Sequence, residues 1–237
     1  MINLRRVVDG YDATHVKGEE FRPLIDTPRA REASEFMLAL LEFSPPTILT
    51  MSWDEQGALF NEGRVAMMYE WATRASRVTP ASPSAGNIGF VAHPVGSTAL
   101  DAAPRNNVSP VGGFVLGIPA NIDPDRVASA WRAIEWLTSP EVIKLFVQHG
   151  EYMMPRFSVA ADPEVRRLSP VIGAVDAMSK KDPLRLWPRP PVAEYPTIVA
   201  ILGEELRDML TRKHTVKNTL RRSQRRVDAV MRDHHHY

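Results

Sequence analysis

Prolines that follow a small polar residue constrain the fold more strongly than any other feature of the chain, and five of these dipeptides are interpreted as helix starts. A Ser, Thr or Asp side chain can accept hydrogen bonds from the free N–H groups at the start of a helix. Proline at the first helical position loses no hydrogen bond. Each dipeptide therefore predicts the start of a helix. The five are Thr27-Pro28, Asp123-Pro124, Ser139-Pro140, Asp162-Pro163 and Ser169-Pro170.

Apolar residues at helical spacing follow these starts. The stripe after Thr27 should end before Pro45-Pro46, the stripe after Asp123 keeps a period of 3.6 residues, and the shorter stripe after Ser139 should end at Gly150. Two more stripes near the C-terminus predict a final pair of helices. These are Ile198, Ile201, Leu202, Leu206 and Leu210, and then Val216, Leu220, Val227 and Val230.

Two short segments are typical of strands. Residues 86–94 predict a strand ended by proline, and residues 111–119 predict a second, fully buried strand. Residues 79–86 and 96–110 are expected to be loops. Because helices dominate and the strands are short and separated, the sequence predicts a helix-rich, mixed α/β chain.

Composition excludes several classes of protein. The chain of 237 residues has no cysteine, which excludes disulfides, zinc–thiolate sites and thiol catalysis. With no run of 18 apolar residues, we expect no membrane insertion. Residues 1–10 carry charges but no apolar stretch behind them, so we expect no secretory signal. The net charge of +1 gives the whole chain no field that would select nucleic acid.

Motifs of catalysis and of metal binding are not found. The sequence has no glycine-rich phosphate loop, and its adjacent carboxylates Asp54 and Glu55 point in different directions, unlike a glycosidase pair. The run His234-His235-His236 could bind a metal adventitiously, but a frayed terminus is the favoured interpretation. We therefore expect no enzyme, no metal site and no cofactor.

The C-terminal segment is basic. Residues 211–237 contain eight Lys or Arg residues against two Asp. Four arginines lie opposite the apolar residues of the last predicted helix, which favours a solvated face over contact with nucleic acid or anionic lipid. They are Arg221, Arg222, Arg225 and Arg226.

An ordered series of segments carries the functional information. The pattern F-x-x-G-x-x-A-M at 60–67 is followed by Val111-Gly112-Gly113-Phe114, then by W-L-T-S-P-E at 136–141 and P-R-x-S-V at 155–159. This order resembles the extracellular solute-binding proteins of ABC importers, specifically the family-1, maltose-binding-protein-like group, which captures sugars and polyols. The resemblance begins near Asp26 and covers only the later part of the family.

The resemblance implies an incomplete two-lobe architecture of the periplasmic-binding-protein type II kind. Residues 1–110 and 157–237 would belong to the C-terminal lobe, and residues 111–156 would cross into the N-terminal lobe. It also implies a periplasmic or extracellular location, ligand capture by lobe closure, and the permease subunits of an ABC importer as partners.

A sugar site needs flat aromatic surfaces, hydrogen-bonding side chains and accessible backbone amides. Trp71 could provide an aromatic plate or could be core, and the glycine pair could admit a ligand or serve packing. Arg156 could bind hydroxyls or tie a loop to a carboxylate. Trp53, Trp131 and Trp136 are interpreted as structural. The predicted ligand-binding residues are Tyr69, Glu70, Trp71, Gly112, Gly113, Phe114, Arg156 and Tyr195.

The first functional hypothesis is therefore a non-catalytic substrate-binding component of an ABC transporter for a sugar or polyol, in a truncated form. Two alternatives remain open. One is a fragment without function, left with an apolar face. The other is an interaction protein that uses its basic C-terminal helix.

Overall fold

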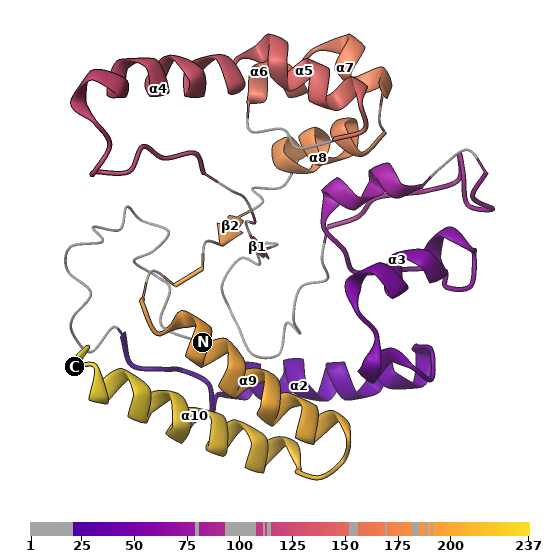
Figure 1. Ribbon diagram of the computed structural model, residues 1–237. Coiled ribbons are helices and arrows are strands. Elements are labelled where there is room, and N and C mark those ends of the chain that lie inside the picture. Colours follow the sequence, from indigo (N-terminus) through magenta and orange to yellow (C-terminus); the bar gives the residue numbers. More distant parts are fainter. Residues whose placement is uncertain are drawn as a thin grey trace. The chain divides into compact units, whose positions relative to one another are not determined.

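The contacts within the computed structural model divide the chain into two compact units, each assembled from segments far apart in sequence (Figure 1). Unit 1 contains Met1–Thr50, Pro94–Val111 and Arg185–Tyr237, and unit 2 contains Met51–His93 and Gly112–Leu184. The structure describes residues 21–78, 81–92, 108–110, 112, 115–151, 156–168, 170–181, 185–187, 189–190 and 192–237.

Unit 1 is built on three helices and a small parallel sheet. Two strands, β1 and β2, pair in parallel with Val108 opposite Arg185. The long helices α9 and α10 lie side by side, and α10 also contacts α2 (Figure 1). The elements are α2 (Pro28–Leu40), the 3-10 turns η2 (Leu41–Phe43) and η3 (Ile48–Thr50), β1 (Val108–Pro110), β2 (Arg185–Trp187), α9 (Tyr195–Leu210) and α10 (Val216–Asp233).

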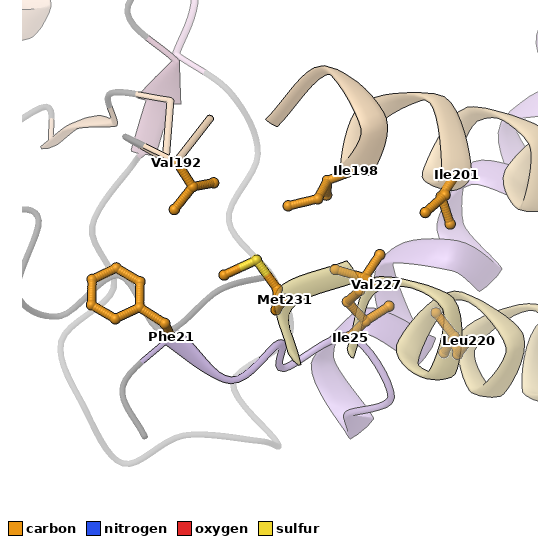
Figure 2. Packing of buried hydrophobic residues seen from close by; sticks show 8 residues of the cluster. All are labelled: Phe21, Ile25, Val192, Ile198, Ile201, Leu220, Val227 and Met231. Carbon is orange, nitrogen blue, oxygen red and sulfur yellow. The ribbon is translucent and has the colours of Figure 1, made fainter. Parts of the chain in front are cut away.

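The core of unit 1 joins the first described residues to the last two helices (Figure 2). Val227 and Met231 of α10 are completely buried. Gln224 adds a polar link, because its amide oxygen accepts from the N–H of Ile25 at 2.8 Å and its amide nitrogen donates to the carbonyl of Pro23 at 2.8 Å. The buried apolar cluster consists of Phe21, Ile25, Val192, Ile198, Ile201, Leu220, Val227 and Met231.

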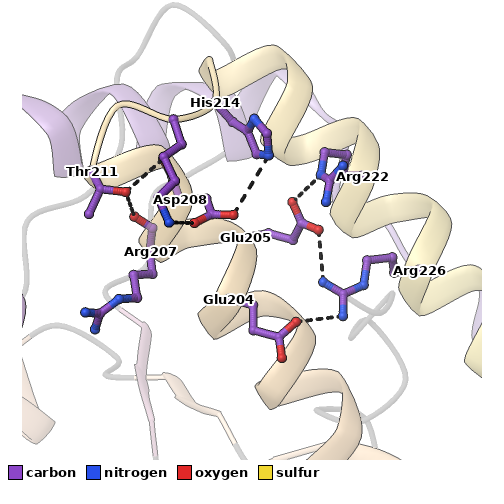
Figure 3. Close-up of polar contacts among 9 residues, drawn as sticks. Glu204, Glu205, Arg207, Asp208, Thr211, His214, Arg222 and Arg226 are labelled. Atoms are coloured by element: carbon purple, nitrogen blue, oxygen red, sulfur yellow. Dashed lines mark hydrogen bonds and ion pairs between the residues drawn. The ribbon is translucent and has the colours of Figure 1, made fainter.

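A buried carboxylate fastens α9 to α10 (Figure 3). The side chain of Glu205 is 1% exposed and accepts hydrogen bonds from Arg222 at 2.7 Å and from Arg226 at 2.9 Å. Burial alone would raise the pKa of Glu205, but the two guanidinium groups overcome that effect and hold its pKa below the ordinary value. Two of the four arginines expected on a solvated face therefore bind α9 instead.

The C-terminal histidine run is ordered, so the expectation of a frayed terminus is wrong. His236 Nε2 lies 2.8 Å from a carboxylate oxygen of Glu194, and His234 Nδ1 lies 3.1 Å from the other oxygen. The phenol of Tyr237 donates to Asp228 at 2.7 Å. Burial raises the pKa of Tyr237 to about 12, so the phenol keeps this donor proton at neutral pH.

Unit 2 is helical in its described part. Its core lies among α5, α6, α7 and α8, and consists of Ile143, Val147, Val159, Val165, Val171 and Ile172. The elements are α3 (Trp53–Asn61), the 3-10 helix η4 (Ala72–Arg77), α4 (Pro124–Leu137), α5 (Pro140–Gln148), α6 (Phe157–Ala160), α7 (Pro163–Leu168) and α8 (Pro170–Lys181).

Helix α4 has no buried residue, although its sequence carries a regular apolar stripe. Val127 is 41% exposed and Trp131 is 55% exposed. Trp136 is 64% exposed. These two tryptophans, interpreted as structural from the sequence, therefore contribute little to the core of unit 2.

The predicted helix starts are confirmed, with α2, α4, α5, α7 and α8 each beginning at the proline of its dipeptide. The side chains of Thr27, Asp123, Ser139 and Asp162 accept hydrogen bonds from backbone N–H groups of the first turns. Among the described residues, no helix is long and apolar enough to cross a bilayer.

Both strand predictions are wrong at the described positions. Residues 87–92 and 115–119 are not strands, and Val115, expected to be buried, is 95% exposed. The observed strand at Val108–Pro110 lies in a segment expected to be a loop. A strand requires a hydrogen-bonded neighbour, and in the described part of the chain only β1 and β2 provide one for each other.

The Glu205 network makes a prediction about stability. Glu205→Gln should lower the free energy of unfolding of unit 1 by about 2 kcal/mol at pH 7. This loss is smaller than that for a fully buried ion pair, because both arginines are partly exposed. Glu204→Gln is the matched control, since Glu204 also binds Arg226 but is 64% exposed, and it should cost less than about 1 kcal/mol. Urea unfolding followed by circular dichroism measures both.

The stability difference between wild type and Glu205→Gln should depend on pH. Because the pKa of Glu205 is lowered in the folded state, its contribution is present above the pKa of the unfolded chain and is lost as the pH falls through the folded pKa. The difference between wild type and Glu205→Gln should therefore shrink in acid. Equal costs for Glu204→Gln and Glu205→Gln, or a difference that grows in acid, would contradict this account of the α9–α10 pair.

Candidate functional site

A turn at Gly63 returns the chain along α3. The helix ends at Asn61, and Gly63 adopts a φ of +70°, which glycine accepts without steric cost. The N–H of Arg64 donates back to the carbonyl of Leu59 at 2.9 Å. Further along, the side-chain amide of Gln56 donates to the carbonyl of Tyr69 at 2.7 Å. The motif at 60–67 thus places Tyr69-Glu70-Trp71 beside α3.

The three predicted residues of this segment have different environments. Tyr69 is 65% exposed. The side chain of Glu70 is 10% exposed, and its carboxylate accepts from the N–H of Trp71 at 2.7 Å. Trp71 itself is partly buried. The carboxylate of Glu70 therefore fixes the backbone N–H of Trp71, the residue that carries the indole.

Trp71 packs directly against the backbone of Gly112. A Cβ atom at position 112 would lie 2.8 Å from Cζ3 and 2.9 Å from Cη2 of the indole, closer than real Cβ contacts allow. Both residues belong to unit 2, although 41 positions separate them in the sequence. The structure thus brings together two predicted site residues from different segments, an aromatic ring and an exposed backbone without a side chain.

Three residues beside Trp71 were missed by the sequence reasoning. The guanidinium of Arg74 donates to Asp54 at 2.9 Å and lies 5.3 Å from the ring centroid of Trp53. Asp54 was considered only as half of a catalytic pair, and Trp53 only as structural. The i, i+4 spacing of Glu70 and Arg74 was a usable signal, whereas the contact across 20 residues to Asp54 was not.

Arg156 and Tyr195, two further predicted residues, make contacts of their own. Arg156 donates through Nε to the backbone carbonyl of Thr138 at 2.6 Å, rather than to the carboxylate considered for it. Tyr195 starts α9 and packs on the core of unit 1, with Arg189 6.0 Å from its ring centroid. Gly113 and Phe114 lie outside the described residues.

Trp71 offers a flat, partly buried aromatic ring. A flat ring can cover the C–H face of a polyhydroxylated ligand, and neighbouring polar groups can bind hydroxyls. Among the described residues, no group of three His, Asp or Glu side chains is arranged to hold a metal ion.

Comparison with known proteins identifies the family. The family model for bacterial extracellular solute-binding proteins matches residues 2–144, which is more than half of the chain. The chain belongs to this family. No curated protein matches it.

Solved structures of solute-binding proteins share its fold. A protein from Agrobacterium radiobacter, in complex with ribitol, is 26% identical with a TM-score of 0.73, over 97% of this chain and 55% of that one. Maltose-bound T. maritima MalE3 is 23% identical with a TM-score of 0.72, over 91% and 54%. A protein from Agrobacterium vitis with bound D-mannitol is 23% identical with a TM-score of 0.65, over 92% and 54%.

These matches confirm the family resemblance and the helix-rich periplasmic-binding-protein fold. The chain spans about half the length of the solved structures that it matches. The fold therefore corresponds to part of a periplasmic binding protein.

The contact between Trp71 and Gly112 predicts the effect of adding one carbon. Gly112→Ala should displace the indole, shift the ¹⁵N resonance of the Trp71 ring, and cost about 1–3 kcal/mol of unit 2 stability through overpacking. The five indole resonances can be assigned by single Trp→Phe substitutions. Gly117→Ala is the matched control, because a Cβ there meets no atom within 4 Å. Equal spectra for the two variants would contradict the contact.

Proposed function

We propose that this chain is the substrate-binding component of an ABC importer for a polyol or sugar, and that Trp71 is the surface on which the ligand lies. The observation that carries this proposal is the packing of the Trp71 indole against Gly112. An aromatic ring beside a backbone without a side chain allows a ligand to contact both. The described chemistry around the ring is suited to binding without catalysis.

The ligand class is inferred from the relatives. The Agrobacterium radiobacter protein is in complex with ribitol. This chain is 26% identical to it over 97% of this chain and 55% of that one. An acyclic polyol presents C–H groups along its chain, and these suit contact with a flat aromatic ring. We therefore place polyols before disaccharides among the candidate ligands.

The proposed mechanism is closure of two lobes on the ligand, after which the closed form docks on the permease subunits. In this proposal residues 1–110 and 157–237 belong to one lobe and residues 111–156 cross into the other. This division differs from the two compact units, in which residues 51–93 and 157–184 group with residues 112–156. The family's extracellular role favours a periplasmic or extracellular location. Nucleic acid has no place in this mechanism, and two of the four arginines that could contact it are already paired with Glu204 and Glu205.

The length of the chain limits its expected affinity. A micromolar ligand corresponds to about −8 kcal/mol, and if two lobes contribute equally, one lobe retains about −4 kcal/mol, or a dissociation constant of roughly 1 mM. We expect these 237 residues alone to bind ribitol or mannitol this weakly. Micromolar affinity would contradict the proposed sharing of contacts between lobes.

Titration with ribitol, mannitol and maltose, followed through the indole resonances, tests the proposal. The Trp71 resonance should shift in a saturable way with at least one of them, and Trp71→Ala should abolish the binding. Trp136→Ala is the control, because Trp136 is a 64% exposed tryptophan on α4 and should leave binding unchanged. If no ligand shifts Trp71 at concentrations far above 1 mM, the proposed function is wrong.

A further inference from the structure

Arg74 occupies a central position beside the proposed binding ring. Its side chain is only 18% exposed, which is unusual for an arginine, and it contacts three side chains at once. The guanidinium donates to Asp54 at 2.9 Å, Nε lies 3.7 Å from the carboxylate of Glu70, and the group lies over the ring of Trp53. Two of these partners belong to α3, and the third is the residue before Trp71.

The backbone connects Arg74 to Trp71 as well. The N–H of Arg74 donates to the carbonyl of Trp71 at 2.9 Å, closing the first turn of η4. Glu70 accepts from the N–H of Trp71 on the other side and forms its ion pair with Arg74. The backbone of Trp71 is therefore held at both its N–H and its carbonyl, and Arg74 or a partner of Arg74 makes each bond.

From this geometry, and resting on the function proposed above, we infer that Arg74 is the positioning residue of the binding surface. It clamps the segment 70–74 onto α3 and so keeps the indole of Trp71 against Gly112. It acts through Trp71, and the proposal needs no contact between Arg74 and the ligand. Glu70, predicted from the sequence to bind ligand, becomes part of the same clamp.

The chemistry of arginine suits this role. The planar guanidinium can donate to a carboxylate at its edge while its face lies against an aromatic ring, and a lysine ammonium cannot do both. The positive charge also compensates Glu70, whose side chain is largely buried.

The test uses the full chain labelled with ¹⁵N-tryptophan. Arg74→Met should shift or broaden the indole resonances of Trp71 and Trp53, while those of Trp131 and Trp136 stay unchanged. Arg74→Lys should restore the spectrum only in part, since it keeps the charge and loses the planar contacts. Arg64→Met is the matched control, because Arg64 is an exposed arginine of the same unit that pairs with the also exposed Glu62 at 3.6 Å, and it should leave all resonances in place.

Ribitol titration of the same variants provides the second readout. Releasing the ring should weaken binding by about threefold to tenfold, since the ligand must then order the Trp71 side chain itself. Should Arg74→Met fail to fold, Asp54→Asn removes one partner of Arg74 from an exposed position and should produce a smaller shift at Trp71 in the same direction.

The two proposals fail in different ways. If ribitol, mannitol and maltose all leave the wild-type Trp71 resonance in place, the binding function is overturned, whatever the Arg74 variants do. If a ligand binds wild type but Arg74→Met leaves both the Trp71 resonance and the affinity unchanged, the positioning role is overturned and the binding function stands. A general loss of unit 2 structure would move all the indoles of that unit together, and this too would contradict a specific role.

Discussion

The close approach of the Trp71 ring to Gly112 is the constraint on which the account of unit 2 depends. It joins the segment after α3 to the segment before α4, and it leaves no room for a side chain at position 112. An indole can stay packed against a glycine backbone only if the backbone that flanks the indole is itself fixed. Glu70, Arg74 and Gln56 provide that fixation through hydrogen bonds shorter than 3.0 Å to the backbone of residues 69–71.

Unit 1 depends on a different kind of interaction. Its two last helices are held by an apolar core and by a buried carboxylate shared between two arginines. Neither arginine is fully buried, so the pair costs less desolvation than an interior salt bridge would. The C-terminal tail, which binds Glu194 through two histidines, extends the same packing to the last residues of the chain.

The sequence was most informative where the physics is local. A polar residue before proline determines a helix start within a few residues, so α2, α4, α5 and α7 could be predicted with their caps. Strands depend on partners elsewhere in the chain, and the apolar run that contains Val115 was therefore misinterpreted as buried. Position 71 and position 112 could be selected by family resemblance and by residue type. The i, i+4 spacing to Glu70 could have indicated Arg74, but its contact with Asp54 could not be predicted because it spans 20 residues.

The central claim is that a polyol lies on the indole of Trp71. Intermolecular nuclear Overhauser effects between bound ribitol and the ¹⁵N-labelled tryptophan side chains measure this directly. The account predicts cross-peaks from the C–H protons of ribitol to the ring of Trp71. Cross-peaks to Trp131 or Trp136 of α4, with none to Trp71, would contradict it.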